Sequence, residues 1–124
     1  MSKAYSVSFE SWDGPMTTIV WCKTRGQAKV QALGMDGFED ARFTELRAIR
    51  APWADNFSKL SSDQMIVEEL KQGWHWTFDY AFEPAREDDV ALIEQVGGFS
   101  KFTDLIWKKQ IVFNNKLDRY VGVE

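Results

Sequence analysis

Few residues in this chain of 124 could carry acid–base or nucleophilic chemistry. His75 is the single histidine and Cys22 the single cysteine, so a serine or cysteine nucleophile would have to use His75 as its base. No nucleophile-elbow pattern supports such a pair, and no residue stands out as the partner that would orient His75. Trp74 and Trp76 flank His75, which favours a structural histidine that is partly buried or at an edge. We therefore expect no catalytic residue.

Carboxylates give two further candidates, and neither predicts an active site. Glu69-Leu70-Lys71 has the E-x-K spacing found at the end of some nuclease sites, but it falls in an expected helix rather than a strand. Glu87-Asp88-Asp89 are consecutive and point in different directions, so a charge cluster at a helix start is favoured over a calcium or magnesium site. One histidine, one cysteine and scattered carboxylates do not form the clusters that zinc or iron prefers. The sequence predicts no metal, no cofactor and no enzyme, with a small nuclease or hydrolase the weakest alternative.

Basic residues gather in two groups that could contact phosphate. The groups are Arg42, Arg47 and Arg50, and then Lys101, Lys108, Lys109 and Lys116. Neighbouring acids (Glu39, Asp40, Glu45 and Asp104) offset them, and no recognition helix or RNP-like strand accompanies them, which favours solvated faces. A nucleic-acid contact through the arginine group stays open as an alternative, and salt-dependent binding would test it.

The stretch WHWTFDYAF, residues 74–82, places an aromatic ring at every second position. As a strand it would send Trp74, Trp76, Phe78, Tyr80 and Phe82 to one face, and His75, Thr77, Asp79, Ala81 and Glu83 to the other. The polar face offers two carboxylates and no Lys or Arg, whereas a base-stacking platform combines rings with positive charge. The pattern favours a core strand over a ligand surface, with Trp74 as the one ring to check for exposure.

Tryptophans outside that stretch, at positions 12, 21, 53 and 107, lie in apolar patterns and are expected to anchor the core. An exposed one would be an interface candidate, because Trp is enriched among binding hot spots. The residues that we expect to be candidates for partner binding are Arg42, Arg47, Arg50, Trp53, Trp74, Lys108 and Lys109.

Composition bounds the class of protein. A hydrophobic content of 44%, an aromatic content of 15% and a charged content of 27% indicate one globular domain, or one domain in two lobes at 1–58 and 59–124. The net charge of -4 argues against a general nucleic-acid coat. No run approaches the roughly 18 apolar residues of a membrane span, and the single Cys22, expected to be a buried, inert thiol in a strand, cannot form an intramolecular disulfide. A cytoplasmic protein is expected.

Residues 1–58 read as ββαβ. Two strands, 4–12 and 16–23, flank a turn at Asp13-Gly14-Pro15, and Thr24 and Gln27 have capping-box spacing at the start of a helix. Residues 43–50 fit both helical and alternating patterns, and we favour a short turn and a third strand that ends at Pro52. Residues 53–59 are expected to form a connector that wraps back over the core.

Residues 59–124 read as helix, strand, helix and hairpin. Ser61 and Gln64 form a second capping-box pair, and Gly73 supplies a left-handed stop. Residues 90–96 fit either a helix or a strand, Ser100 could cap a last helix, and 111–123 could close as a hairpin. The predicted fold class is α+β, an antiparallel sheet with helices packed on one side and a small aromatic-rich C-terminal lobe.

The N-terminal half resembles small bacteriophage accessory proteins of unknown function. The resemblance covers roughly the first 55 residues and is carried by Phe9-Glu10-Ser11-Trp12-Asp13-Gly14, Thr17-Thr18-Ile19-Val20, Thr24-Arg25-Gly26 and Ala28-Lys29. Some such proteins carry a zinc knuckle, and positions of comparable spacing here are Phe78, Ala81, Phe99 and Phe102. The resemblance implies a C-terminal lobe that has lost its Cys ligands and holds a hydrophobic cluster where the ion would be.

Phage proteins of this kind often act without catalysis, by binding a host or defence protein and blocking it, as anti-CRISPR and other anti-defence proteins do. The resemblance therefore implies an inhibitor whose partner is a host or defence-system protein. It also implies a location in the host cytosol if the chain is phage-encoded. The oligomeric state stays open, since exposed aromatic surface would also support a homodimer.

Overall fold

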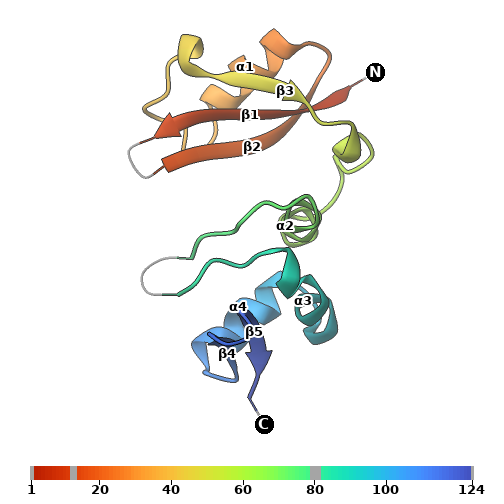
Figure 1. Cartoon of the computed structure of the whole chain (residues 1–124). Coiled ribbons are helices and arrows are strands. Elements are labelled where there is room, and N and C mark those ends of the chain that lie inside the picture. The colour runs from red at the N-terminus through yellow and green to blue at the C-terminus, as the bar shows by residue number, and fades with distance from the viewer. Residues whose placement is uncertain (1, 12–13, 79–81, 124) are drawn as a thin grey trace. The chain divides into compact units, whose positions relative to one another are not determined.

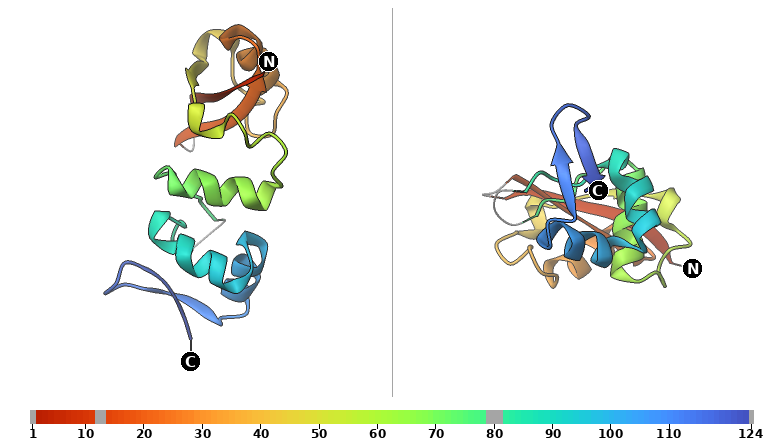
Figure 2. Two further views of the ribbon diagram at one scale, coloured as in Figure 1. Left: turned by 90° about the vertical axis from the view of Figure 1, so that its right-hand side faces the viewer. Right: turned by 90° about the horizontal axis from the view of Figure 1, so that it is seen from below.

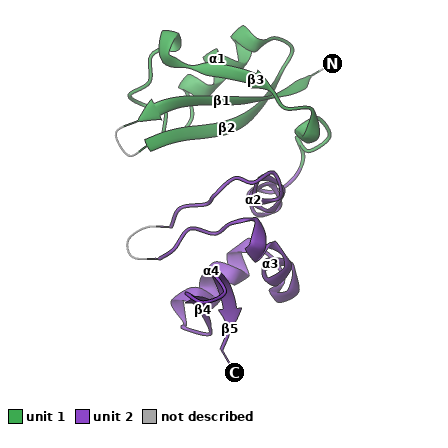
Figure 3. Cartoon of the chain, viewed as in Figure 1, with its two compact units in different colours: residues 1–59 green, residues 60–124 purple. Residues whose placement is uncertain are grey.

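The structure is a computed structural model that describes residues 2–11, 14–78 and 82–123 (Figure 1). The chain divides into two compact units, residues 1–59 and 60–124 (Figure 3), and each is described by itself. The elements of the first unit are β1 (Lys3–Ser11), β2 (Gly14–Cys22), α1 (Arg25–Leu33), η1 (Phe43–Glu45), β3 (Arg47–Arg50) and η2 (Pro52–Ala54). Those of the second are α2 (Ser62–Lys71), η3 (Glu87–Asp89), α3 (Val90–Val96), α4 (Phe99–Trp107), β4 (Ile111–Asn114) and β5 (Arg119–Gly122).

The first unit is an antiparallel sheet of order β2-β1-β3 with α1 packed on one face, which confirms the predicted α+β class and ββαβ order. Alternation along β1 buries Tyr5, Val7 and Phe9 on the face that meets α1. Ala28 and Ala32 supply the buried side of the helix. Phe38 completes this core, with its ring centroid 5.1 Å from that of Phe9.

Local signals in the first unit act largely as the sequence indicates. The Thr24 hydroxyl accepts a hydrogen bond from the Gln27 N–H at 3.2 Å and so caps α1. Residues 43–50 form a short 3₁₀ turn and then β3, which confirms the favoured alternative. The prediction that Cys22 is buried is wrong: the residue is half-buried at the end of β2, and its thiol donates to the Gln31 side chain at 2.9 Å. Trp12 lies outside the described residues.

The second unit begins with the predicted helix. The Ser61 hydroxyl accepts from the Gln64 N–H at 3.2 Å, and the Gln64 side chain accepts from the Ser61 N–H at 3.0 Å, so both halves of the capping box are present. Gly73 has φ +88°, the left-handed conformation expected of a helix stop. Residues 90–96 form α3, which settles the helix-or-strand alternative.

The expectation that Ser100 caps the last helix is wrong. Helix α4 begins one residue earlier, and Gly98, with φ +124°, is its N-cap without a side-chain hydrogen bond. The Ser100 N–H instead donates to a carboxylate oxygen of Asp63 at 3.0 Å. An acidic residue of α2 thus satisfies a free donor in the first turn of α4, a long-range cap that local spacing does not reveal.

The predicted aromatic strand is also wrong over its described residues. Trp76 and Ala85 form an isolated antiparallel bridge, with N–H to C=O distances of 2.9 and 2.8 Å, and no ladder extends from it among the residues described. Residues 79–81, which include Asp79, Tyr80 and Ala81, lie outside the described part.

The rings of this stretch nevertheless enter a C-terminal aromatic cluster. Phe78 and Phe82 pack against the core of the unit, and Phe78 stacks on Phe99 with centroids 5.9 Å apart and planes inclined by 3°. Trp74 is half-buried, whereas Trp76 keeps 40% of its surface exposed. The prediction that these rings belong to the core therefore fits Phe78 and Phe82 better than it fits Trp76.

The C-terminal hairpin is confirmed. Strands β4 and β5 pair antiparallel from Ile111 opposite Gly122 to Asn114 opposite Arg119, and β4 packs against α4 (Figure 2). The Asn114 side chain accepts the N–H groups of Lys116 and Leu117 at 2.9 and 3.0 Å, which closes the turn. Within the described residues, no helix is long and apolar enough to cross a membrane.

Candidate functional site

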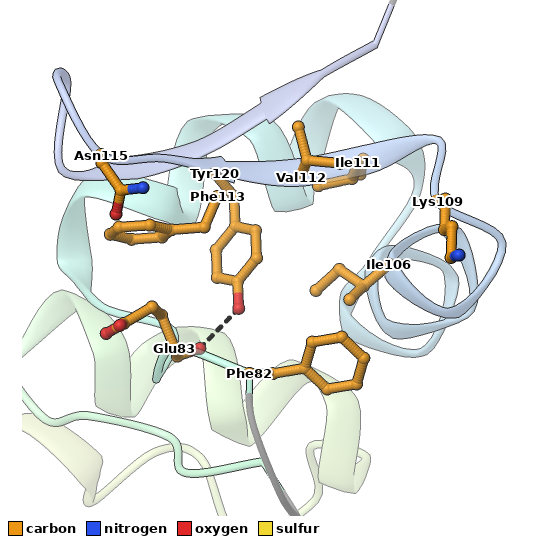
Figure 4. Close-up of a pocket in the computed structure, with 9 residues that line it drawn as sticks. All are labelled: Phe82, Glu83, Ile106, Lys109, Ile111, Val112, Phe113, Asn115 and Tyr120. Atoms are coloured by element: carbon orange, nitrogen blue, oxygen red, sulfur yellow. Dashed lines mark hydrogen bonds between the residues drawn. The ribbon is translucent and has the colours of Figure 1, made fainter.

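A hollow of about 400 Å³ opens between α4, the β4–β5 hairpin and the segment before Pro84 (Figure 4). Its volume lies within the range of roughly 300–1,000 Å³ that is common for ligand pockets. The lining is mostly apolar, and we call it the C-terminal hollow. Its lining residues are Phe82, Glu83, Ile106, Lys109, Ile111, Val112, Phe113, Asn115 and Tyr120.

Tyr120 forms the inner wall of the C-terminal hollow and is 3% exposed. Its hydroxyl donates to the Glu83 carbonyl at 2.5 Å, which ties β5 to the segment before Pro84. Burial first, and then the charges of Asp89 and Glu83, raise the pKa of Tyr120 to about 12. The phenol therefore stays protonated and acts as a structural donor rather than as a general base.

Asp89 fixes Tyr120 from the other side. It is 2% exposed, and its two carboxylate oxygens accept the N–H groups of Tyr120, at 2.8 Å, and Arg86, at 2.9 Å. The sequence predicts that Glu87, Asp88 and Asp89 form a charge cluster at a helix start, and all three lie in η3, directly before α3. Glu87 and Asp88 are exposed, whereas the buried side chain of Asp89 joins η3 to β5 inside the fold.

An exposed tryptophan stands beside the C-terminal hollow. Trp107, at the end of α4, is 62% exposed, and its ring meets that of Phe82 edge-to-face with centroids 5.1 Å apart. Val112, also on the hollow, is 41% exposed. Phe82, Trp107 and Val112 together form what we call the apolar surface. The expectation that Trp107 anchors the core is wrong, because it lies on the solvent side of α4.

The two predicted lysines behave differently at this surface. Lys108 forms an ion pair with Asp104 at 2.9 Å, one helical turn earlier. Lys109 follows the helix end in the left-handed conformation, with φ +61°, and lines the C-terminal hollow beside Ile106. Of the two, Lys109 is the one positioned to meet a bound group.

The predicted arginine face divides in the structure. Arg50 forms a two-pronged ion pair with Asp55, with Nη1 to Oδ1 at 2.6 Å, and also donates to the Ala4 carbonyl at 3.0 Å. The Arg50 hydrogen bond, with the Ala4 N–H as a second donor, lowers the pKa of Asp55 to about 2. Arg47 lies three positions away on the same strand and so projects from the opposite face. Arg42 is exposed at the start of η1, outside the strand.

The other predicted candidates are separated from the apolar surface along the chain. Trp53, in η2, and Trp74 are half-buried, and His75 is exposed. Lys71, the cation of the E-x-K spacing, contacts Glu68 at 3.2 Å and Glu94 at 3.5 Å. Among the described residues, no group of three or more potential metal ligands is found.

The first unit has a second, polar hollow of about 620 Å³, which lies beside strand β3 and helix α1. Its cationic residues are Arg25 and Lys29 of α1 and Arg47 of β3, and we call these three the basic edge. This grouping joins one predicted arginine to two α1 residues that the sequence analysis did not select. Arg25 and Lys29 are four residues apart and so lie on the same face of a helix, which is the sequence signal that could have identified them.

Comparisons with known proteins add no relative: no protein-family model, no curated protein and no solved structure matches this chain. The resemblance to bacteriophage accessory proteins therefore stays a prediction. Three of the four positions compared with zinc-knuckle ligands, Phe78, Phe99 and Phe102, do lie together in the C-terminal aromatic cluster.

Proposed function

We propose that this chain is a non-catalytic accessory protein of the bacteriophage type, which binds a host or defence protein through the apolar surface and blocks it. The observation that carries the proposal is Trp107, which is 62% exposed beside a largely apolar hollow of about 400 Å³. A tryptophan left in water next to an unfilled apolar concavity is the arrangement of a binding hot spot.

The apolar surface is held ready for a partner. Phe82 contacts the Trp107 ring edge-to-face, and the Tyr120–Glu83 hydrogen bond holds the segment that carries Phe82. A surface fixed in its binding conformation loses less conformational entropy when a partner docks. An apolar partner side chain that fills the C-terminal hollow and covers Trp107 would gain free energy from the apolar area buried.

The experiment compares three forms of the purified chain as bait in extract of the native host: wild type, Trp107→Ser and Val30→Ser. Val30, on α1, is 63% exposed and serves as a matched loss of exposed apolar surface. We expect wild type and Val30→Ser to retain one host or defence protein that Trp107→Ser loses, and to inhibit the activity of that protein.

Three results would contradict the proposal: no protein retained reproducibly, equal retention by Trp107→Ser, or retention without inhibition. Sedimentation of the chain alone is run in parallel. A wild-type homodimer that Trp107→Ser converts to a monomer would assign the apolar surface to self-association instead, and would also contradict it.

A further inference from the structure

The basic edge places three cations around one polar hollow. Arg25 and Arg47 form no ion pair in the part of the chain that the structure describes. Arg50, by contrast, is paired with Asp55. The nearest acid in sequence, Glu45, accepts the Arg42 backbone N–H at 2.8 Å and is held in the η1 capping box. Cations left unpaired around one polar hollow are available to an anionic partner.

The charge of the chain is unevenly distributed between its units. Residues 1–59 carry eight basic and seven acidic side chains, whereas residues 60–124 carry seven basic and twelve acidic ones. The net charge of -4 therefore arises in the second unit, and the first has a net charge of +1. The net negative charge argues against a protein that coats nucleic acid over its whole surface. It does not argue against binding of an anion at the basic edge.

An exposed aromatic ring adjoins the basic edge. Phe43, in η1, is 44% exposed, and the Lys29 ammonium lies 5.4 Å from its ring centroid. Lys29 also lines the polar hollow, so the ring and the three cations form one continuous surface. Rings beside a track of cations are what proteins use to hold single-stranded nucleic acid, with bases stacked and phosphates paired.

We propose that the basic edge and Phe43 bind single-stranded nucleic acid. Arg25, Lys29 and Arg47 pair with successive phosphates, and an unstacked base packs on the exposed part of the Phe43 ring. A duplex fits less well, since its bases are already stacked and unavailable to the ring. An added acidic β-strand is disfavoured, because β3 is only four residues long and offers few backbone groups for strand pairing.

The test is fluorescence anisotropy of the full chain with a labelled 12-nucleotide single strand of mixed sequence, over a series from 50 to 200 mM salt. Three contacted phosphates imply a slope of log K against log salt of about -2, hence a loss of affinity of about 15- to 20-fold across that series. Arg25→Gln, Lys29→Gln and Arg47→Gln together should bring the slope close to zero. Phe43→Leu should keep the slope and weaken binding about five-fold or more.

The matched control carries Lys3→Gln, Lys23→Gln and Lys59→Gln, three exposed lysines of the same unit, and should bind as wild type does. Thermal unfolding verifies that each variant is folded. The proposal is overturned by no binding at 50 mM salt, by equal losses in the control, or by an unchanged affinity of Phe43→Leu. Equal or tighter binding of a matched duplex or of a polyglutamate peptide would overturn it too. The basic edge and Phe43 lie in the first unit, so the outcome of this experiment does not bear on the apolar surface in the second unit.

Discussion

Replacing Asp89 with alanine removes the acceptor of two backbone N–H groups at once. Tyr120 is 3% exposed and its N–H bond to Asp89 is buried, so leaving that N–H unpaired costs about 1–3 kcal/mol. The Arg86 N–H belongs to a half-buried residue and loses less. We expect Asp89→Ala to destabilise the second unit by about 3 kcal/mol, and Asp89→Asn, which keeps one oxygen acceptor, by about half of that.

Hydrogen exchange followed by mass spectrometry measures this effect where it arises. A loss of about 3 kcal/mol corresponds to amide exchange about 100-fold faster in the segments of α3 and β5. Asp88→Asn is the control, because it removes the same charge from the adjacent, exposed position. Exchange in Asp89→Ala within a factor of about 2 of wild type would refute the reasoning, as would an equal acceleration in the control.

Three further expectations rest on single groups. Burial raises the pKa of Glu69 from 4.5 to about 7, so the native state disfavours its charge and loses stability as pH rises from 4.5 through 7. Glu69→Gln should raise stability at pH 8 by about 1–2 kcal/mol, after allowance for its partial exposure, and leave it unchanged at pH 4, by urea unfolding; no gain at pH 8 would contradict this. The pKa of Asp55 is lowered to about 2, mainly by the Arg50 hydrogen bond, so its contribution is present above pH 3.8 and is lost as pH falls through 2. Asp55→Asn should therefore lower the melting temperature at pH 7 and reduce the fall in melting temperature as pH decreases toward 2. If the melting temperature of the variant fell with pH as steeply as that of wild type, Asp55 would not make this contribution. Tyr120→Phe removes the bond to the Glu83 carbonyl and should cost about 1 kcal/mol by urea unfolding, with faster exchange at residues 82–85; unaltered exchange there would show that the hydroxyl does not hold the segment.

The sequence predicted the elements that local chemistry determines. The Ser61–Gln64 capping box, the positive-φ stop at Gly73 and the alternation along β1 are properties of a few adjacent residues, and each took its expected form. The strand assigned to WHWTFDYAF failed because a ladder needs a partner strand that pairs along its length. Only the single Trp76–Ala85 bridge forms among the described residues, and sequence alternation does not report on the partner.

The candidate site was predictable only in fragments. Lys109 was selected from a charge cluster, but Phe82 and Trp107 were both assigned to the core, because their apolar neighbours are the same whether a ring faces inward or outward. The contact between them joins residues 25 positions apart, and Tyr120 is brought to the site by Asp89 from η3. Such pairings depend on tertiary packing, which no local pattern encodes.

A photocrosslinking amino acid placed at position 107 tests the proposed binding surface most directly, with the same group placed at position 30 as the control. Expressed in the native host, the chain labelled at 107 should crosslink to a single host or defence protein, and the chain labelled at 30 should not. The purified partner should then be inhibited by wild type and not by Trp107→Ser. No crosslinked protein at position 107, or the same proteins from both positions, would contradict the account.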